Sequence, residues 1–502
     1  MSQTIATEGG TIRFFPMLLL LPPLLFFILR HFKILSPLKS SLLPPGPYPW
    51  PIIGNILQVG NKPHVTLTQL AQNHGPLISL RLGTKLMVVG SSPIVAKEIL
   101  KTHDRGLSGR FVPSVFTHMQ SEINNLSLGW SLECSGRWKF LRALCRAELF
   151  SGKAMESQAC LREKKVMDMV ELLGTREGEV VKIGEVIFAT VFNMLSNALL
   201  SKDFISLKAE SVDGGLKGLI RKLMEVSSTP NVSDFFPILS GLDLQGQKKK
   251  TMELNGRISF MWAAIIKERR ERKGSVVLQG DFLDVMIDNN FTDEQINYLL
   301  MELFAAGTDS SSSTIEWAMA ELIKNPESMK KVQEELAREI KQDVVKELHL
   351  PQLNYLHACV KETLRLHPPA PLLLPHRALE SYNVASYTIP KDSQVLVNVW
   401  AIGRDPMNWK DPLVFKPERF LKSAVDFKGN DFEFLPFSAG RRICPGIPMA
   451  AKVVPLVLAS LIQVFDWSLP HGNDPEKLDM SEKFGVTLQK EQPLHLIPKV
   501  RS

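Results

Sequence analysis

The stretch of sequence that decides the fold is Phe437-Ser-Ala-Gly440-Arg-Arg442-Ile-Cys444-Pro-Gly446, near the C-terminus. It fits the pattern F-x-x-G-x-R-x-C-x-G, and average residue usage gives a chance match in about one chain of this length in ten thousand. A cysteine binds a metal as the thiolate, and positive charges nearby lower the pKa of the thiol. We therefore expect Arg441 and Arg442 to favour a metal-binding thiolate at Cys444.

A helix should begin shortly after Cys444, because the segment from Ala450 to Phe465 is apolar. Backbone N–H groups at the start of that helix can donate hydrogen bonds to the sulfur and limit the charge that the sulfur passes to a metal. Gly440 and Gly446 have no side chains, so they would let the backbone approach a flat, bulky ligand closely.

The composition is that of an ordinary globular protein, with 502 residues of which 44% are hydrophobic and 22% charged. A disordered tail, a collagen-like rod and a disulfide-rich miniprotein are therefore excluded. The net charge of +7 is a mild excess that suits a membrane surface or an acidic protein partner and argues against nucleic acid. The 5 cysteines are odd in number and form no C-x-x-C, which argues against a disulfide framework and a structural zinc site.

An uncharged apolar segment, Phe14 to Leu29, lies near the N-terminus and with its flanks approaches the ~20 residues that span a bilayer. A cleaved signal peptide is the alternative, but no small-x-small cleavage site follows. Basic residues follow instead and predict a cytosolic C-terminal side: Arg30, His31, Lys33 and Lys39. We therefore expect residues 1–35 to be an uncleaved single-pass anchor, with the body of the chain in the cytosol.

Residues 36–60 are predicted to form a hinge and linker, because the prolines between Leu43 and Pro51 favour a stiff, extended segment. We expect residues 61–502 to form one catalytic domain, since no glycine- or serine-rich linker interrupts them. A cytosolic body also predicts that three glycosylation sequons stay unmodified, those at Asn125, Asn231 and Asn290.

Helical patterns dominate from about residue 135 to 370, and the longest runs from Asp293 to Lys324. Thr292 and Gln295 form a capping-box pattern before it, and Asn325-Pro326 ends it. At 1.5 Å per residue this helix would be roughly 48 Å long and could cross a whole domain. Its middle, residues 304–314, holds many polar residues that are poor helix formers, so another interaction must compensate for them.

Short strands are predicted at Ile78–Leu82 and Met87–Val89, joined by a turn at Gly83. Residues 387–389 and 395–399 have a similar pattern on either side of Pro390-Lys-Asp, and we expect them to pair as a hairpin. Together with the helices, these segments predict a mainly α protein with small β-sheets.

Four further motifs lie in order along the chain: Trp138-Lys-Phe-Leu-Arg142, Ala306-Gly-Thr-Asp-Ser310, Glu362-Thr-Leu-Arg365 and Pro417-Glu-Arg419-Phe. With the Cys444 loop and the proline-rich hinge, they resemble the cytochrome P-450 superfamily of heme-thiolate monooxygenases, in which this loop supplies the axial ligand of the iron. The resemblance covers nearly the whole chain. It implies the cytochrome P-450 fold, mainly α with small β-sheets, and an N-terminal membrane anchor.

The resemblance also implies the site. Heme b would be the cofactor, with six residues that bind it: Cys444 as the ligand of the iron, Trp138, Arg142, Arg377, Phe437 and Arg442. Asp309 and Ser310 would be the catalytic residues that deliver protons during oxygen activation. The implied structural triad is Glu362, Arg365 and Arg419. The implied substrate pocket is mainly apolar and comprises Val112, Phe116, Phe304, Thr308, Ala370, Leu374 and Val486.

Electrons from NADPH would arrive through NADPH-cytochrome P-450 reductase, a membrane-bound flavoprotein. We expect its acidic face to dock on the basic side around Lys139, Arg441 and Arg442. The implied location is the endoplasmic reticulum membrane, with a single span, a cytosolic catalytic domain and no nucleic-acid partner.

Ser310 departs from the family pattern, since most members have threonine at this position. Serine keeps the hydroxyl that relays protons but lacks the methyl group that restricts its rotamer. We expect oxygen activation to persist, with looser coupling between electron use and product formation.

Three segments, residues 145–152, 426–433 and 484–491, are similar to a plant group that oxidises alkaloids and includes N-methylcoclaurine hydroxylase, corytuberine synthase and littorine mutase. The reactions of that group are hydroxylation, phenol coupling and oxidative rearrangement of benzylisoquinoline or tropane-type substrates. The alternative is a monoterpenol hydroxylase that resembles geraniol hydroxylase, which shares Ile402-Gly-Arg-Asp and Glu482-Lys-Phe-Gly with this chain.

Each motif also has a plainer interpretation. Glu362 and Arg365 are three residues apart on a predicted helix, where most such pairs are surface ion pairs of small effect. Trp138 would by default be a core aromatic residue. A heme sensor and a heme-thiolate isomerase are alternative classes, but neither needs the Asp309–Ser310 pair, and a nonenzymatic membrane scaffold leaves the Cys444 loop unexplained.

Overall fold

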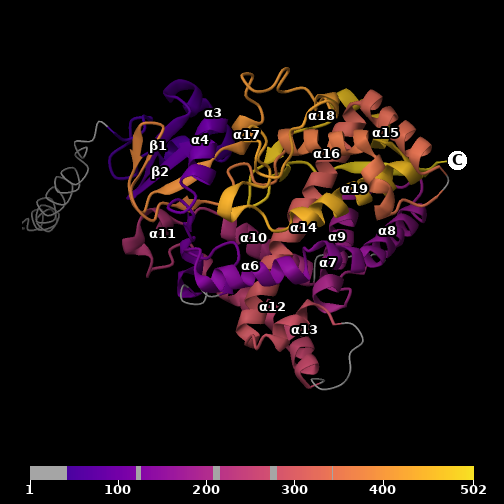
Figure 1. The fold of residues 1–502 in the computed structure, drawn as a ribbon, viewed down its shortest axis with the longest axis horizontal. Helices are drawn as coiled ribbons and strands as arrows, with labels where there is room; N and C mark the ends of the chain where they lie inside the picture. Colours follow the sequence, from indigo (N-terminus) through magenta and orange to yellow (C-terminus); the bar gives the residue numbers. More distant parts are fainter. Residues whose placement is uncertain (1–41, 120–125, 207–214, 272–279, 342, 502) are drawn as a thin grey trace, which may run out of the picture.

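The computed structural model describes residues 42–119, 126–206, 215–271, 280–341 and 343–501. Helices make up most of the molecule and the largest sheet lies toward one end, so the predicted mainly α fold with small sheets is confirmed (Figure 1). The predicted membrane anchor and the sequon at Asn125 lie outside the described residues.

The helices that come before the longest one are α2 (Ile56–Val59), α3 (Pro63–His74), α4 (Pro93–Lys97), α6 (Gly136–Glu148), α7 (Gly152–Ser157), α8 (Ala159–Gly174), α9 (Ile183–Leu200), α10 (Leu216–Ser228), α11 (Val232–Phe235), α12 (Gln247–Glu271) and α13 (Phe282–Asp288). The longest helix and those after it are α14 (Asp293–Lys324), α15 (Pro326–Glu339), α16 (Asn354–Leu366), α17 (Val399–Ile402), α18 (Glu418–Leu421) and α19 (Ile447–Val464).

The described strands form small sheets. A five-stranded sheet has the order β1 (Leu77–Leu82), β2 (Lys85–Gly90), β8 (Gln394–Val397), β5 (His376–Arg377) and β3 (Gly109–Arg110). A three-stranded sheet has the order β4 (Val181–Lys182), β12 (His495–Val500) and β9 (Phe465–Ser468). Two pairs complete the set: β6 (Tyr382–Val384) with β7 (Tyr387–Ile389), and β10 (Glu482–Lys483) with β11 (Gln489–Lys490).

One predicted strand pairing is confirmed and one is wrong. β1 and β2 pair as antiparallel neighbours, as predicted. β7 and β8 do not pair with each other: β7 pairs with β6, whereas β8 enters the five-stranded sheet between β2 and β5. The reason is the apolar character of β8, since Val395 and Val397 are buried on one face and Leu396 on the other, and a central position in a sheet covers both faces of such a strand.

Helix α14 crosses the molecule with the predicted bounds, and both halves of the predicted capping box form between Thr292 and Gln295 (Figure 1). The poor helix formers in its middle are accommodated because their hydroxyls donate to the carbonyls four residues earlier. These hydrogen bonds are Ser310 to Ala306 at 2.7 Å, Ser312 to Thr308 at 2.9 Å and Thr314 to Ser310 at 2.8 Å.

Helix α19 begins earlier than predicted, at Ile447 instead of Ala450, with Gly446 at its N-cap. Pro448 therefore lies inside the first turn, where a proline is tolerated because its missing N–H has no partner within the helix. Of the described helices, α9 and α19 are long and apolar enough to cross a membrane, and both contribute to the hydrophobic cores of the body.

Two hydrophobic cores hold α14 in place. The N-terminal half of α14 packs with α9, α10, α12 and α13, and the C-terminal half packs with α8, α16 and α19. Ala306, between the two halves, is nevertheless exposed. The middle of the central helix therefore presents an accessible face.

Candidate functional site

The loop that carries Cys444 is closed by its own backbone, because the N–H of Cys444 donates to the carbonyl of Phe437 at 3.0 Å. Phe437 also packs against the ring of Phe427 in a T-shaped contact. Gly440 has a φ of 67°, and a Cβ there would lie 1.8 Å from the carbonyl oxygen of Leu100. Gly440 therefore lets the loop pack against η1 (Glu98–Thr102), and its expected role beside a flat ligand stays a prediction.

The Cys444 thiol lies deep in the molecule but keeps some accessible surface, which places it at the wall of an interior space. Burial raises the pKa of the thiol, whereas hydrogen bonds from the N–H groups of Gly446 and Ile447 and the charge of Arg142 act to lower it. The N–H groups at the start of α19 thus act on the thiol in the predicted direction. Because burial prevails, the thiolate needs the positive charge of a bound metal ion.

The two arginines of the loop do not supply the charge that was predicted for them. Arg441 is exposed and pairs with Asp104 at 3.1 Å. Arg442 is buried and donates to the carbonyls of Ser108 at 3.0 Å and Ser131 at 2.5 Å. The charge that acts on the thiol comes from Arg142, on α6, a helix far from the loop in sequence.

Three arginines, Arg110, Arg142 and Arg442, gather beside the loop and bind backbone carbonyls, with no ion pair to a carboxylate within the described part of the chain. Arg110 donates to the carbonyls of Gly129 at 3.0 Å and Leu374 at 2.9 Å. Burial lowers the pKa of all three, and repulsion from Arg442 helps to lower that of Arg110 to about 9. Buried like charges are costly, so the cluster favours an anionic ligand.

Trp138 lies against two of these cations, with its ring 4.7 Å from the guanidinium carbon of Arg442 and 5.4 Å from that of Arg142. Its Nε1–H donates to the carbonyl of Leu128 at 2.8 Å. Heme is a flat apolar ring with an iron ion and two carboxylates. The site therefore fits heme, because the Cys444 thiol can bind the iron and the buried arginines can bind the carboxylates.

Arg377 does not join this cluster, although it was predicted to bind the cofactor. It pairs with Asp392 at 3.3 Å instead. Its neighbour His376 is buried, with Nδ1 2.6 Å from the carbonyl of Leu107, since successive residues of a strand face opposite sides. Arg110 pairs with His376 in the sheet, and we assign Arg110 to the candidate site in place of Arg377.

Glu302 of α14 was missed by the sequence analysis. Its carboxylate accepts hydrogen bonds from Ser127 Oγ at 3.0 Å and from the N–H groups of Leu128 and Gly129 at 2.8 and 2.5 Å. Burial raises the pKa of Glu302, and these donors act against that effect. Glu302 thereby fixes the segment whose carbonyls receive the side chains of the arginine cluster. A charged residue within an otherwise apolar run was the signal that could have identified it.

Asp309 and Ser310, the predicted catalytic residues, lie in the middle of α14. Asp309 is buried and lines a cavity of about 690 Å³ together with Ser313 and Glu316. Ser310 is half-exposed and donates to Ala306, the exposed residue of this helix face. Successive residues of a helix diverge by about 100°, so the Asp309 carboxylate and the Ser310 hydroxyl leave α14 in different directions, and only Asp309 lines this cavity.

Phe304 and Thr308 of α14 are both buried and do not line the 690 Å³ cavity. The ring of Phe304 is fully buried and stacks 4.8 Å from that of Phe192 and 5.3 Å from that of Trp262. Thr308, one turn later, is 1% exposed. Phe304 therefore packs against α9 and α12. The membership of Phe304 and Thr308 in the substrate pocket stays a prediction.

The other predicted pocket residues remain accessible. Val112 and Phe116 pack with Tyr298 of α14, and Val486 lines the 690 Å³ cavity. Leu374 lies beside Gly129, next to the segment held by Glu302, and Ala370 is half-buried.

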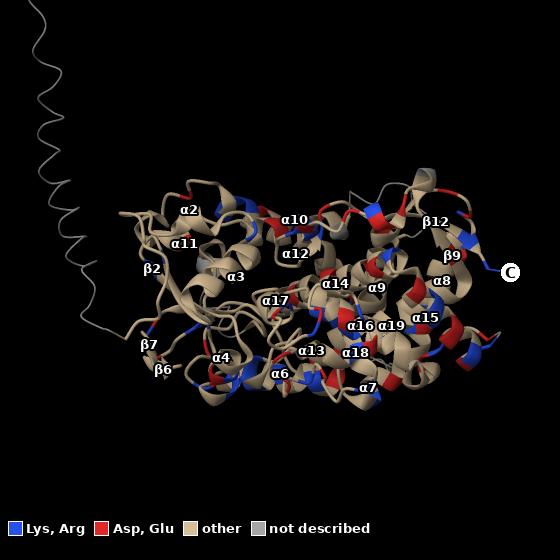
Figure 2. Cartoon of the chain, turned by 90° about the horizontal axis from the view of Figure 1, so that it is seen from above, with Lys and Arg blue, Asp and Glu red and all other residues tan. Residues whose placement is uncertain are grey.

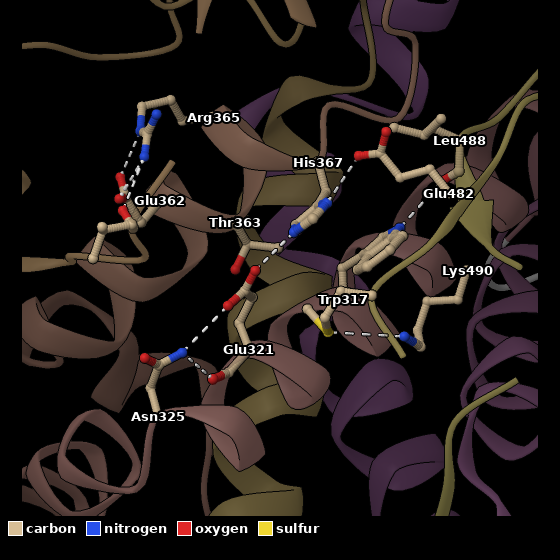
Figure 3. Close-up of polar contacts among 12 residues, drawn as sticks. Trp317, Glu321, Asn325, Glu362, Thr363, Arg365, His367, Glu482, Leu488 and Lys490 are labelled. Carbon is tan, nitrogen blue, oxygen red and sulfur yellow. Dashed lines mark hydrogen bonds and ion pairs between the residues drawn. The ribbon is translucent and has the colours of Figure 1, made fainter. Parts of the chain in front are cut away.

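Glu362 and Arg365 form a buried pair on α16, with two N–O distances of 2.8 Å (Figure 3). Arg419 donates to the same carboxylate at 3.0 Å. Arg365 also donates to the carbonyls of Gly403 and Pro412. The plainer interpretation as a surface ion pair is therefore wrong, and the cluster fastens α16 to the segment that leads to the Cys444 loop.

Known proteins resemble the chain over nearly its whole length. The Cytochrome P450 family model matches residues 44–497. The probable (S)-N-methylcoclaurine 3'-hydroxylase isozyme 2 of Coptis japonica is 52% identical over 479 residues, which are 95% of this chain and 97% of that protein. Corytuberine synthase of Coptis japonica is 47% identical over 96% of this chain and 98% of its own length. Geraniol 8-hydroxylase of Swertia mussotii is 43% identical over 91% of this chain and 94% of its own length.

Proposed function

The chain belongs to the cytochrome P450 family, and on that premise we propose that it is a heme-thiolate monooxygenase that oxidises a benzylisoquinoline alkaloid with NADPH and O2. The observation that supports the cofactor is the buried arginine cluster around Trp138, beside the Cys444 thiol. Such a cluster favours an anionic ligand, and heme is a flat ring with two carboxylates and a metal ion.

The relatives support the substrate class. Proteins named for (S)-N-methylcoclaurine and corytuberine are 52% and 47% identical to this chain, whereas a geraniol 8-hydroxylase is 43% identical. We therefore place hydroxylation or phenol coupling of a benzylisoquinoline before rearrangement of a tropane-type ester. A monoterpenol hydroxylase is the second candidate.

The residues of the chain divide the work between holding the cofactor and moving protons. Cys444 would bind the iron, and Arg110, Arg142 and Arg442 would bind the carboxylates of heme, which supplies the oxygen chemistry. The Asp309 carboxylate borders the cavity and would take up protons there, and the Ser310 hydroxyl would hold a proton beside the substrate.

The proposed reductase surface differs in one residue from the predicted one. Arg442 is buried and cannot contact a partner. Lys139 and Arg441 are exposed, and α6 is fastened to the loop because Arg142 donates to the carbonyl of Ile443 at 2.6 Å. These two cations therefore lie on connected elements on the thiol side, where an acidic face of the reductase would dock.

Membrane attachment at the endoplasmic reticulum is supported by exposed apolar side chains at the N-terminal end. They are Tyr48, Trp50, Leu57 and Ile238. Two hydrogen bonds connect these segments, from the Gly83 N–H to Ile53 and from the Thr84 N–H to Phe235. The end with α2 and α11 also carries few charged residues (Figure 2). Exposed apolar side chains on adjoining segments are typical of a membrane contact.

The test is expression of the full chain with a cytochrome P450 reductase in yeast microsomes. We expect the reduced carbon monoxide difference spectrum to show the band of thiolate ligation, and (S)-N-methylcoclaurine to be oxidised only with NADPH and O2. The variant Cys444→Ala should lose both the band and the activity. A wild-type protein without the band would contradict the proposal, and oxidation of geraniol alone would support the second candidate.

A further inference from the structure

A buried polar cluster lies beside the cavity, outside the residues already assigned. Its centre is Glu482, in β10, whose side chain is 11% exposed. The residues that follow Glu482 form a turn, residues 484–487, that lines the 690 Å³ cavity together with Asp309 and Ser313 of α14. We call these four residues the cavity turn.

Glu482 is bound by four side chains from three separate parts of the chain. Oε2 lies 3.0 Å from Nε2 of His64, and Oε1 lies 3.2 Å from Nδ1 of His367 and 3.1 Å from a guanidinium nitrogen of Arg404. Nε1–H of Trp400 donates to both oxygens, at 3.2 and 3.1 Å. Each lone-pair direction of the carboxylate therefore has a partner.

His367 connects this carboxylate to α14 (Figure 3). Its other ring nitrogen, Nε2, lies 2.8 Å from Oε1 of Glu321, and its ring stacks flat on Trp317 with 3.9 Å between the centroids. Glu321 and Trp317 lie one helical turn apart on α14. The start of the cavity turn is thus held against the C-terminal half of the central helix.

The end of the cavity turn is held by the same helix. The carbonyl of Leu488 accepts a hydrogen bond from Ser313 Oγ at 2.7 Å and from Nε1 of Trp317 at 3.4 Å. The N–H of Leu488 donates to Pro369 at 2.8 Å. Both ends of a four-residue turn are therefore anchored, and Trp317 takes part in each anchor.

The charge of Glu482 is maintained in spite of its burial. Burial alone would raise its pKa, but hydrogen bonds from His367 and His64 and the charge of Arg404 hold the pKa well below its usual range. The anchor is hence an ionised carboxylate with charge-assisted hydrogen bonds, which are stronger and more directional than neutral ones.

We propose that Glu482 is a positioning residue that fixes the cavity turn against α14 and thereby determines which substrates fit and which carbon they present. This inference rests on the proposed function, since the cavity turn includes Val486 of the predicted substrate pocket. A purely structural role would require only that the hairpin stay folded. A positioning role requires that small displacements of the turn change substrate selection while the cofactor stays bound.

The experiment compares Glu482→Gln, Trp400→Phe and wild type in microsomes with reductase. Glu482→Gln keeps the shape and removes the charge, and Trp400→Phe keeps a ring and removes one N–H donor to the carboxylate. The matched control is Glu476→Gln, the same substitution at an exposed residue six positions earlier. The readouts are the carbon monoxide difference spectrum, KM and kcat for (S)-N-methylcoclaurine, the spectral dissociation constant of that compound, and the ratio of products.

We expect Glu482→Gln to raise KM and the spectral dissociation constant about tenfold and to change the product ratio, while the thiolate band and kcat stay near wild type. Trp400→Phe should change the same quantities in the same direction by a smaller factor, and Glu476→Gln should change none. An unchanged KM and product ratio in Glu482→Gln with a normal band would overturn the inference. So would loss of the band in Glu482→Gln together with wild-type KM and product ratio in Trp400→Phe. Absence of the band in wild type would instead contradict the proposed function.

Discussion

Ser310 offers the most direct test of chemistry at the scale of one residue. Its hydroxyl donates to Ala306 on the accessible face of α14. Threonine would keep this hydroxyl and add a methyl group that restricts the rotamer. We expect Ser310→Thr to release less hydrogen peroxide per NADPH than wild type, and Ser310→Ala to release more.

The measurement is peroxide formed against NADPH consumed, with saturating substrate. Ser460→Ala is the control, because its hydroxyl makes the same kind of backward hydrogen bond, to Leu456 at 2.9 Å, but is buried within α19. Equal leakage in wild type and Ser310→Thr would show that the rotamer of this hydroxyl does not control coupling.

The ion pairs of Glu362 are expected to contribute to the stability of the fold. Glu362→Gln leaves the buried Arg365 and the partly buried Arg419 without a counter-charge, and breaking a buried pair in this way costs about 3–5 kcal/mol. The expected result is a large fall in the temperature at which heme is lost on heating. Glu334→Gln, which breaks an exposed pair with Lys330, should cost less than about 1 kcal/mol. Equal effects of the two substitutions would rule out the buried pair as a scaffold.

Site residues that are neighbours in the sequence were predicted correctly. Site residues that come together only because distant strands pair were missed. Cys444 and the N–H donors of Gly446 and Ile447 are neighbours in sequence, so their geometry followed from the motif. Arg110 and His376 face each other only because β3 pairs with β5, and no local pattern marks them. Arg377 was chosen instead because the family resemblance does not say which of two adjacent strand residues points inward.

At the scale of elements, Gly440 controls how the Cys444 loop packs on η1. Gly440→Ala would force a side chain into a positive φ and against a backbone carbonyl, with a cost of at least about 1–2 kcal/mol. We expect a smaller thiolate band per unit of protein. Gly256→Ala is the control, since this glycine lies within α12 with open space around it, and alanine there should stabilise by about 0.5–1 kcal/mol. A normal band in Gly440→Ala would show that the loop tolerates displacement.

The bounds of elements with their own start and stop signals were predicted well, whereas the pairing partners of strands were not. The bounds of α14 agree to the residue because a capping box and Asn325-Pro326 act locally. The predicted pairing of β8 was wrong because its actual partner, β2, lies about 300 residues away in the chain. A strand that is apolar on both faces is pulled to the centre of whichever sheet the tertiary fold offers, and this is not encoded near the strand.

At the scale of the whole molecule, acid should weaken the fold through His376. Burial and the charges of Arg110 and Arg442 hold its pKa well below the ordinary value of 6.5. Below pH 6.5 the His376 imidazole therefore stays neutral in the folded state and gains a proton in the unfolded state. The free energy of unfolding is then greatest above pH 6.5 and falls by up to about 1.4 kcal/mol per pH unit below it.

Thermal loss of heme, measured from pH 7.5 to 5.5, tests this dependence. His376→Gln keeps an N–H donor for Leu107 and has no group to titrate, so its midpoint should vary less with pH. The same slope in the variant and in wild type would assign the acid sensitivity to other groups.

Glycosylation of one asparagine, Asn290, can show on which side of the membrane the body of the chain lies. Asn231 is buried and its side chain caps α11, whereas Asn290 is exposed. With a cytosolic body, treatment with an endoglycosidase should not change the mobility of the protein. A version in which residues 1–41 are replaced by a cleavable secretory signal should be modified at Asn290. A shift in the natural chain would reverse the predicted topology.

Arg110, Arg142 and Arg442 are already present in each newly translated chain before any tetrapyrrole reaches it. A ligand that binds only the folded form raises the fraction of folded chains by mass action. Chains made while porphyrin is scarce would be the ones that proteases remove. The abundance of this enzyme in a cell would therefore depend on the supply of iron porphyrin as well as on the supply of its messenger RNA.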